Sequence, residues 1–456
     1  MGGFTFDESV FKAYDIRGVY PKEIDKKFAY NLGRAFAQYT KAKSVMVGFD
    51  GRTSSKALFE SLSKGLTERG VDVVNIGLCS TSASYYAMIQ GKYDAGIMIT
   101  ASHNPKQYNG FKMLGAGPIT IFSDNGALDI LEIMKENKYG VVKKKGKIKK
   151  KDYSKEFLKY LIGFFPSLNK TEKEAVKELK VIVDQSNGAG FTEVEALKKF
   201  FPKCKVLNGR VSGAFPGHDP NPMKPENRRK MVLEIKKSKA DLGVMFDGDA
   251  DRLVFIDEKG CFVRPDLILC VLVDMMSKGS VIYDTRSTRR IQELCDSKNI
   301  KAAMSKSGRT YIYEAMKNER ANLGGEASGH YFFKEFKYLD NAGIAAMKLL
   351  GHIVKQKAKG KTFSELIEPH NKYFHSGELN FKVRNQDKVF LLIEQAFGNA
   401  KKILFIDGLS FYYEDHWFNV RKSNTEPLVR ISIEADTKEL LKDMTSKINN
   451  IMHLAK

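Results

Sequence analysis

Two patterns of apolar residues alternate along most of the chain. Short continuous apolar runs, such as 44–50, 94–100 and 179–184, are typical of strands that are covered on both faces. The segments between them, such as 57–70 and 225–238, place apolar residues three and four positions apart, which predicts helices. Strands that alternate with helices favour α/β domains.

The pattern changes near residue 370. Strand-like segments then follow one another at 377–383, 409–415, 416–422 and 428–435, with helices expected at 388–397 and 438–455. This order indicates a smaller α+β domain. We therefore predict three βαβ-type, mixed-sheet α/β domains and a smaller α+β C-terminal domain, at residues 1–145, 146–251, 252–368 and 369–456.

Composition is that of a water-soluble protein. Of the 456 residues, 43% are hydrophobic and 28% are charged. No apolar run approaches the ~18 residues that would cross a bilayer, and the N-terminus lacks the layout of a signal peptide. The five cysteines are scattered and form no C-x-x-C pair, so we expect reduced thiols, no structural zinc and a cytoplasmic location.

The net charge of +21 raises the question of polyanionic partners. The densest charge is KKKGKIKKK, from Lys143 to Lys151, and it contains no aromatic residue. We interpret this run as a solvated linker, with a nucleic-acid-binding arm as the alternative. A positive field would also attract small phosphorylated substrates. We expect neither nucleic acid nor a membrane as a partner.

The most specific motif is FDGDADR, which contains Asp247, Asp249 and Asp251. In a helix Asp249 would face away from the other two, so the trio must lie in a loop or extended chain. Three close carboxylates repel one another unless a cation such as Mg²⁺ or Ca²⁺ neutralises them. An EF-hand fails because Arg252 replaces the required glycine and both flanks are strand-like. An aspartyl-phosphate phosphatase or a solvated acidic turn would also carry aspartates in such a loop.

A Mg²⁺ ion usually completes its coordination with phosphate oxygens, which directs attention to Ser102 in TASHNPKQYNGFK. The lipase motif is absent, because Thr100 and Asn104 replace its glycines. His103 should point away from Ser102 in an extended turn, so it is a poor base. A phosphorylated Ser102 would supply the missing ligand. Lys112 could offset its charge or be a plain surface lysine.

Two further motifs offer polar side chains. In VRKSNTEP, a guanidinium, two hydroxyls and an amide fit a tetrahedral dianion, from Arg421, Ser423, Asn424 and Thr425. In LGGEASGH, a glycine-hinged loop carries groups suited to sugar hydroxyls and proton transfer: Glu326, Ser328 and His330. An ordinary polar loop is the alternative for each. Arg17, in FKAYDIRG, is a weaker candidate.

Taken together, the chain resembles the α-D-phosphohexomutase superfamily, and within it the phosphomannomutase/phosphoglucomutase enzymes. The resemblance rests on six stretches in order: FKAYDIRG, TASHNPKQYNGFK, HDPNPMKPEN, FDGDADR, GEASGH and RKSNTEP. It implies four domains around a central cleft. The chain departs from the usual pattern at KSGRTYI, where Arg309 replaces a histidine, and at DTRSTRR, where Arg286 replaces a common lysine.

The resemblance also implies roles for individual residues. The serine matching Ser102 is phosphorylated, and its phosphate holds one Mg²⁺ together with the residues matching Asp247, Asp249 and Asp251. Sugar hydroxyls are read by those matching Glu326 and Ser328. The non-reacting phosphate is bound by those matching Arg421, Ser423, Asn424 and Thr425. The reacting phosphoryl group and the proton transfers are surrounded by those matching Arg17, Lys112, Arg252 and His330. Arg286 and Arg309 are expected to contact phosphate or sugar.

The implied activity is reversible transfer between hexose 6-phosphate and hexose 1-phosphate. A hexose 1,6-bisphosphate would serve as intermediate and activator, and Mg²⁺ as cofactor. We expect mannose phosphate as the preferred substrate and glucose phosphate as the second, with a monomer or weak dimer. Phosphoglucomutase, phosphoglucosamine mutase, an inactive sugar-phosphate-binding protein and a basic nucleic-acid-associated protein are the alternatives.

Overall fold

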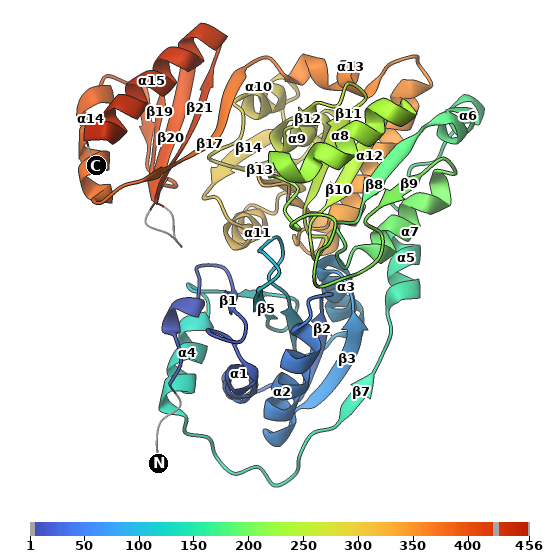
Figure 1. The fold of residues 1–456 in the computed structure, drawn as a ribbon, viewed down its shortest axis with the longest axis vertical. Helices are drawn as coiled ribbons and strands as arrows, with labels where there is room; N and C mark the ends of the chain where they lie inside the picture. The colour runs from blue at the N-terminus through green and yellow to red at the C-terminus, as the bar shows by residue number, and fades with distance from the viewer. Residues whose placement is uncertain (1–4, 423–427, 455–456) are drawn as a thin grey trace. The chain divides into compact units, whose positions relative to one another are not determined.

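The computed structural model of the chain describes residues 5–422 and 428–454 (Figure 1). The chain forms two compact units. Unit 1 contains the chain up to Val263 together with Leu339–Leu366, and unit 2 contains Arg264–Tyr338 together with the chain from Ile367 onwards. Among the described residues, no helix is both long and apolar enough to cross a membrane.

The first sheet of unit 1 has the strand order β1-β5-β4-β2-β3-β7, with β6 paired to β5. Parallel strands β2, β3 and β4 form its middle, and β5 runs antiparallel to β4. The strands are β1 (Ile16–Val19), β2 (Ser44–Phe49), β3 (Asp72–Leu78), β4 (Ala95–Ile99), β5 (Tyr108–Leu114), β6 (Thr120–Ile121) and β7 (Ile148–Lys150). The helices are α1 (Lys26–Thr40), α2 (Ser55–Glu68), α3 (Thr81–Gly91) and α4 (Ala127–Glu136).

Part of the lysine run is a strand and not only a linker. Ile148–Lys150 forms β7, which pairs in parallel with β3 at the edge of the first sheet. All three side chains of β7 are exposed. Exposed lysines on an edge strand discourage pairing with another chain, because they place charge beside the unpaired backbone groups.

The second sheet of unit 1 has the order β12-β11-β10-β8-β9, in which β10 pairs in parallel with β8 and antiparallel with β11. Its strands are β8 (Val181–Asp184), β9 (Lys205–Leu207), β10 (Leu242–Phe246), β11 (Leu253–Asp257) and β12 (Phe262–Val263). The helices are α5 (Ser154–Ile162), α6 (Lys170–Glu178), α7 (Phe191–Phe200), α8 (Pro225–Ser238) and α12 (Ala342–Lys357).

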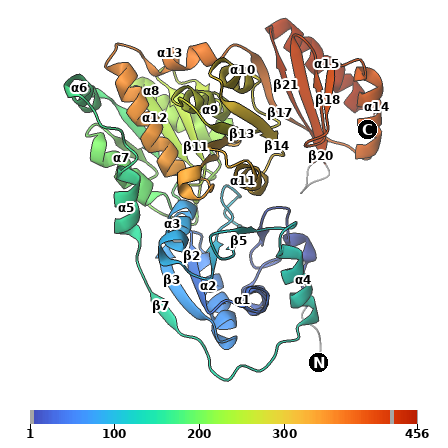
Figure 2. The same cartoon turned by 180° about the vertical axis from the view of Figure 1, so that it is seen from behind.

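Helix α12 (Ala342–Lys357) packs against helices that precede it by more than a hundred residues. The predicted domain bounds place this helix in the third domain, at residues 252–368. In the structure it belongs to unit 1, where it packs against α5, α6, α7 and β11 (Figure 2). Its apolar face is broad, with eleven buried residues, so it needs a large covering surface.

Unit 2 contains two sheets. The first, with order β14-β13-β15-β16, consists of β13 (Ser280–Asp284), β14 (Lys301–Ser305), β15 (Leu323–Gly325) and β16 (Tyr331–Phe333). It is accompanied by α9 (Pro265–Asp274), α10 (Arg290–Ser297) and α11 (Arg309–Asn318). The first three of its strands are parallel and β16 is antiparallel to β15.

The second sheet of unit 2 is antiparallel, with order β17-β21-β20-β19-β18. Its strands are β17 (Phe374–Lys382), β18 (Lys402–Leu404), β19 (Leu409–Tyr412), β20 (His416–Lys422) and β21 (Leu428–Ala435). Helices α14 (Gln386–Phe397) and α15 (Lys438–Leu454) complete this part. Three mixed α/β sheets and a C-terminal α+β sheet confirm the predicted fold class.

Candidate functional site

Ser102 lies in the loop between β4 and β5 and is almost fully buried, with 1% of its surface exposed. Its backbone is left-handed, with φ of 50°, a conformation that costs energy for a residue with a Cβ atom. The Ser102 backbone N–H donates to Oγ1 of Thr100 at 2.9 Å. The surrounding structure therefore holds the serine in a defined and unusual position.

Arg52 supports this loop, and sequence reasoning missed it. Its buried guanidinium donates to the backbone carbonyl oxygens of Ser102 at 2.7 Å and Asn104 at 2.6 Å. It also donates to the carbonyl oxygens of Pro105 at 2.7 Å and Tyr108 at 2.9 Å. Carbonyl groups in a loop lack the hydrogen bonds that a strand or helix would give them. Here a single side chain provides bonds to four carbonyl groups.

Asp50 balances the charge of Arg52. Its carboxylate accepts from Arg52 Nε at 3.1 Å, from Ser55 Oγ at 2.7 Å and from Thr100 Oγ1 at 2.7 Å. Burial raises the pKa of Asp50 and lowers the pKa of Arg52, while their mutual attraction opposes both shifts. The signal in the sequence is DGR directly after a parallel strand, because such strand ends share one edge of the sheet with Ser102.

Asp247, Asp249 and Asp251 lie in the loop between β10 and β11, and each is at most 1% exposed. One oxygen from each lies within 4.8 Å of the others. Burial and the charges of Asp251 and Asp249 raise the pKa of Asp247 well above its usual range. Ser102 Oγ donates to Asp247 Oδ2 at 2.7 Å, so the serine loop and the aspartate loop form one site.

Lys112, on β5, supplies positive charge to this site. Its Nζ lies 2.6 Å from Asp249 Oδ2 and also contacts Asp251. The side chain is only 2% exposed, so the interpretation as a plain surface lysine is wrong. One ammonium group neutralises one of three carboxylates, which leaves negative charge for a cation to balance.

The donors of this site fit Mg²⁺. Oδ1 of Asp249 is buried and has no hydrogen-bond partner within residues 5–422 and 428–454. An uncompensated carboxylate oxygen is costly unless an ion binds it, and carboxylate oxygens are the ligands that Mg²⁺ prefers. Asp247 and Asp251 provide the other protein oxygens within reach.

The N-terminus of α3 holds the aspartate loop from the side of the first sheet. Thr81 Oγ1 donates to Asp249 Oδ2 at 2.5 Å, and the Thr81 backbone N–H donates to the Asp249 carbonyl oxygen at 2.9 Å. The preceding Ser80 donates to the buried carboxyl of Glu193, on α7, at 2.5 Å. Burial raises the pKa of Glu193 to about 7. Sequence reasoning missed all three residues, since nothing local marks such contacts.

His103 does not point away from Ser102, so that expectation was wrong. Its Nδ1 lies 3.3 Å from Ser102 Oγ, because the left-handed backbone at Ser102 replaces the expected extended turn. Arg17, on β1, donates through Nη1 to Asn104 Oδ1 at 2.7 Å and also pairs with Asp15. Arg252 donates its backbone N–H to Asp247 Oδ1 at 3.2 Å.

In unit 2, Arg286 and Glu326 lie near each other. Arg286 Nη2 is 3.8 Å from Glu326 Oε1, and Arg286 Nε donates to Asp284 Oδ2 at 2.7 Å. Glu326 also accepts from the Gly308 backbone N–H at 2.7 Å, just before α11. The other predicted residues of this part are Arg309, buried at the start of α11, the half-buried Ser328, and the buried His330.

Arg421, on β20, is also buried in unit 2. Its Nη2 donates to Glu378 Oε2, on β17, at 2.5 Å, and its Nε lies 4.0 Å from Asp407 Oδ2. The remaining residues of the predicted phosphate cradle lie outside the described part of the chain: Ser423, Asn424 and Thr425.

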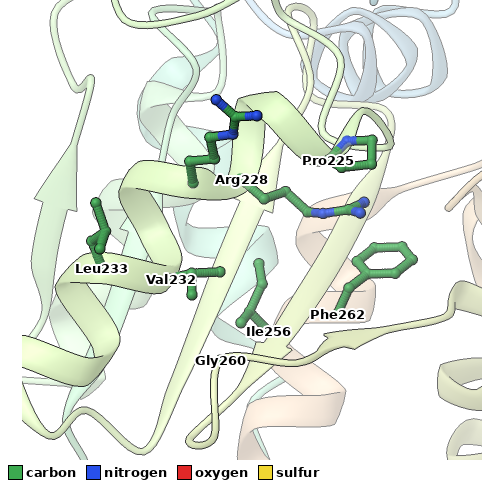
Figure 3. Close-up of a pocket in the computed structure, with 8 residues that line it drawn as sticks. Pro225, Arg228, Val232, Leu233, Ile256, Gly260 and Phe262 are labelled. Atoms are coloured by element: carbon green, nitrogen blue, oxygen red, sulfur yellow. The ribbon is translucent and has the colours of Figure 1, made fainter.

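A surface groove of about 420 Å³ lies between α8 and β12 (Figure 3). Its lining includes Pro225, Val232, Ile256 and Phe262, and the guanidinium of Arg228 stacks on Phe262 at 3.8 Å. None of the predicted site residues that the structure describes lines this groove.

Comparisons with known proteins cover nearly the whole chain. Four family models, for domains I, II and III and the C-terminal domain of phosphoglucomutase/phosphomannomutase, match residues 8–140, 155–260, 264–373 and 378–451. The phosphomannomutase of Methanocaldococcus jannaschii is 34% identical over 459 residues, which cover 98% of each chain. The phosphomannomutase of Vibrio cholerae is 34% identical over 466 residues, with the same coverage.

Solved structures show the same architecture. A phosphoglucomutase/phosphomannomutase family protein from Burkholderia thailandensis gives a TM-score of 0.86 at 28% identity, over 99% of this chain and 98% of the other. Parafusin, a phosphoglucomutase from Paramecium, gives 0.82 at 15% identity, over 99% and 96%, which is a likeness of fold alone. The chain belongs to the phosphoglucomutase/phosphomannomutase family and is an isomerase of the phosphohexomutase class.

Proposed function

We propose that the protein is a Mg²⁺-dependent phosphohexomutase that interconverts hexose 6-phosphate and hexose 1-phosphate, with mannose preferred and glucose second. The observation that carries this proposal is the contact of Ser102 Oγ with Asp247 Oδ2 at 2.7 Å. A buried hydroxyl beside three buried carboxylates is a poor hydrolytic nucleophile but a suitable phosphate carrier, because a cation can bridge carboxylates and phosphate.

The proposed reaction proceeds in two transfers. In the first, the bond from phosphorus to Ser102 Oγ breaks while a bond from phosphorus to the free sugar hydroxyl oxygen forms, and the proton of that hydroxyl ends on Ser102 Oγ. The product is a hexose 1,6-bisphosphate, which turns around. In the second, the bond from the other phosphorus to its sugar oxygen breaks while a bond from that phosphorus to Ser102 Oγ forms, and the proton of Ser102 Oγ ends on the sugar oxygen. Neither phosphate nor proton is consumed overall, as an isomerisation requires.

We assign the residues of this chain to binding, orientation and charge. Phosphoryl transfer depends mainly on alignment and on neutralising the charge that spreads over the transferring group. The proposed residues around the reacting phosphoryl group are Ser102, Arg17, Lys112, Arg252 and His330. Those that hold the substrate are Glu326, Ser328, Arg286, Arg309, Arg421, Ser423, Asn424 and Thr425. Small hexose phosphates are the proposed partners, and the cytoplasm the proposed location.

The proposed cofactor is one Mg²⁺ ion, held by Asp247, Asp249, Asp251 and an oxygen of phosphorylated Ser102. When bound, it would neutralise charge on the reacting phosphate. Lys112 and Thr81 already fix one oxygen of Asp249, which leaves Oδ1 of that residue for the ion. Arg52 and Asp50 hold the serine loop in place beside the three aspartates.

The experiment that tests this function is a parallel assay with mannose, glucose and glucosamine 1-phosphates, each with a sugar bisphosphate as activator. We expect the largest kcat/KM with mannose 1-phosphate, a smaller value with glucose 1-phosphate, and loss of activity in a chelator that Mg²⁺ restores. Preference for glucosamine 1-phosphate would overturn the proposed substrate, and no turnover of any of the three would overturn the function.

A further inference from the structure

Three arginines of unit 2 converge on Glu378, a residue that no motif of the sequence singles out. Arg421 Nη2 donates to Glu378 Oε2 at 2.5 Å, and Arg286 Nη1 lies 3.4 Å from the same oxygen. Arg430 Nη1, on β21, lies 3.4 Å from Oε1. These arginines come from three separate segments of the chain, so the cluster is a built site and not a local pair.

The charge of Glu378 is fixed by these neighbours. Burial alone would raise its pKa, but Arg286, Arg421 and Arg430 outweigh that effect and lower the pKa to about 2. Glu378 is therefore an anion throughout the neutral range. Several guanidinium groups around one anion are the arrangement with which proteins bind phosphates and carboxylates.

Glu378 is also the carboxylate of this cluster that is best able to move away. Its side chain is 27% exposed. Asp284, which pairs with Arg286, is fully buried and also accepts from Ser287 Oγ at 2.6 Å. Asp407, near Arg421, accepts the Ser307 backbone N–H at 3.1 Å. A partly exposed carboxylate at the end of a flexible side chain can exchange with a ligand at lower cost than an anchored one.

We propose that Glu378 is a place-holding anion for the non-reacting phosphate of the substrate: its carboxylate occupies Arg421 and Arg286 whenever that phosphate leaves them. The inference rests on the proposed function, in which both arginines contact substrate. In that reaction the arginines must let go of one phosphate group of the bisphosphate before the bisphosphate can turn around. Without Glu378, this release would leave Arg421 with the more distant Asp407, at 4.0 Å, and would remove one of the anions around Arg286. Release would then be slow, because poorly compensated buried charge is costly. Glu378 removes that cost by taking the place of the departing phosphate.

The place-holding role predicts that loss of Glu378 raises the affinity for phosphate and lowers the rate of turnover. Without the internal competitor, phosphate should bind more tightly and leave more slowly. The chemical step at Ser102 should be unaffected, because Glu378 belongs to unit 2 and touches arginines that hold the non-reacting end. A residue that merely positions the arginines would have the opposite effect on affinity, since its loss would disorder the cradle.

The test compares the full-length protein with Glu378→Gln, which keeps the shape of the side chain and removes its charge. Calorimetric binding of inorganic phosphate should tighten about fivefold, the size of one partly exposed charged pair. In steady state both KM and kcat for hexose phosphate should fall. Single-turnover transfer from phosphorylated Ser102 to the sugar should keep its rate.

Asp387→Asn is the matched control, because it removes one negative charge from an exposed carboxylate that pairs with the neighbouring Lys422. Phosphate affinity in this variant should match that of the wild type. If Glu378→Gln binds phosphate no more tightly than the control, or more weakly, the place-holding role is overturned.

Two further outcomes are separable. If the Glu378→Gln variant is not folded at the temperature of the binding experiment, Glu378→Asp takes its place in the test. Its shorter side chain moves the carboxylate away from Arg421, so this variant should also bind phosphate more tightly. Unchanged or weaker binding in that variant overturns the inference. Because phosphate binding needs no turnover, a wild-type protein without mutase activity would refute the proposed function and leave this test readable.

Discussion

Ser102 Oγ and Asp247 Oδ2 lie 2.7 Å apart although 145 positions separate the two residues in sequence. The contact joins a loop of the first sheet to a loop of the second. A phosphate on the serine would therefore be placed directly beside the aspartates. Both the proposed carrier role of Ser102 and the proposed binding of an ion depend on this contact between the two loops.

Ser102→Ala should reduce mutase turnover below detection while the protein stays folded, because the variant lacks the oxygen proposed to carry the phosphate. Intact-mass analysis of the wild type should show a fraction with one phosphoryl group at Ser102, which the variant lacks. Ser63→Ala is the control: Ser63 is buried, and its Oγ has no hydrogen-bond partner among the described residues. Appreciable turnover by Ser102→Ala would refute the carrier role.

Addition of Mg²⁺ should raise the thermal unfolding temperature of the chelator-treated protein, since a ligand that binds only the folded state stabilises it. At a Mg²⁺ concentration of about 100 times Kd the gain should be about 2.7 kcal/mol. Asp249→Asn should remove most of this gain. Asp129→Asn, at an exposed position of α4, should retain it, and an equal gain in both variants would place the ion elsewhere.

Arg52→Lys should destabilise the protein by about 3–5 kcal/mol, because the three N–H donors of lysine cannot bond four carbonyl groups and Asp50, so buried polar groups lose their partners. The more conservative Thr100→Val removes the hydroxyl between Ser102 and Asp50 and should cost about 1–3 kcal/mol. Both should lower kcat more than they raise KM. Urea unfolding and steady-state kinetics measure these effects.

Thr120→Val is the control for the threonine change. Thr120 is buried, and its Oγ1 has no hydrogen-bond partner in the part of the chain that the structure describes. We expect almost no change in stability or kcat. Similar losses in Thr120→Val and Thr100→Val would mean that the contacts of the serine loop carry no special weight.

Glu193 should make stability depend on pH. Its pKa is raised from 4.5 to about 7 by burial, so the folded state holds a proton that the unfolded state has already released. Its contribution is fully present below about pH 4.5, declines as the pH rises to about 7, and then stays level. The total decline should be about 3 kcal/mol.

Glu193→Gln should flatten this part of the pH profile, because glutamine does not titrate and can still accept from Ser80. Urea unfolding at pH 5 and pH 8 for wild type and variant gives the comparison. The wild type should lose more stability than the variant between these two values. Parallel profiles for the two proteins would show that Glu193 is ionised in both states.

Arg421→Ala should raise KM for hexose phosphates about tenfold to a hundredfold, the value of one or two charge-assisted hydrogen bonds. The adjacent Lys422→Ala, which changes an exposed side chain on the same strand, should leave KM nearly unchanged. Unchanged Michaelis constants for Arg421→Ala would remove this residue from the phosphate cradle.

Local patterns predicted most of the elements. The strands at 416–422 and 428–435 and the helix at 225–238 begin and end at the predicted residues. Their signals are local: apolar runs for the strands, and proline at the first turn of the helix. The four domain boundaries themselves stay a prediction.

The candidate site was predictable only where its residues form motifs. Asp247, Asp249 and Asp251 share one loop, so their spacing revealed the cluster. Arg52 was missed because its partners are backbone carbonyl groups more than fifty residues away, which no side-chain pattern marks. Strand β7 departs from expectation for the same reason, since its pairing with β3 decided where it lies.

Arg52 holds the serine loop through the main chain of four residues. Arg52 grips main-chain oxygens, which every amino acid provides. The exposed side chains of Lys106 and Gln107 take no part in this grip. These two positions can therefore be randomised without loss of the contacts by which Arg52 holds Ser102 and Asn104.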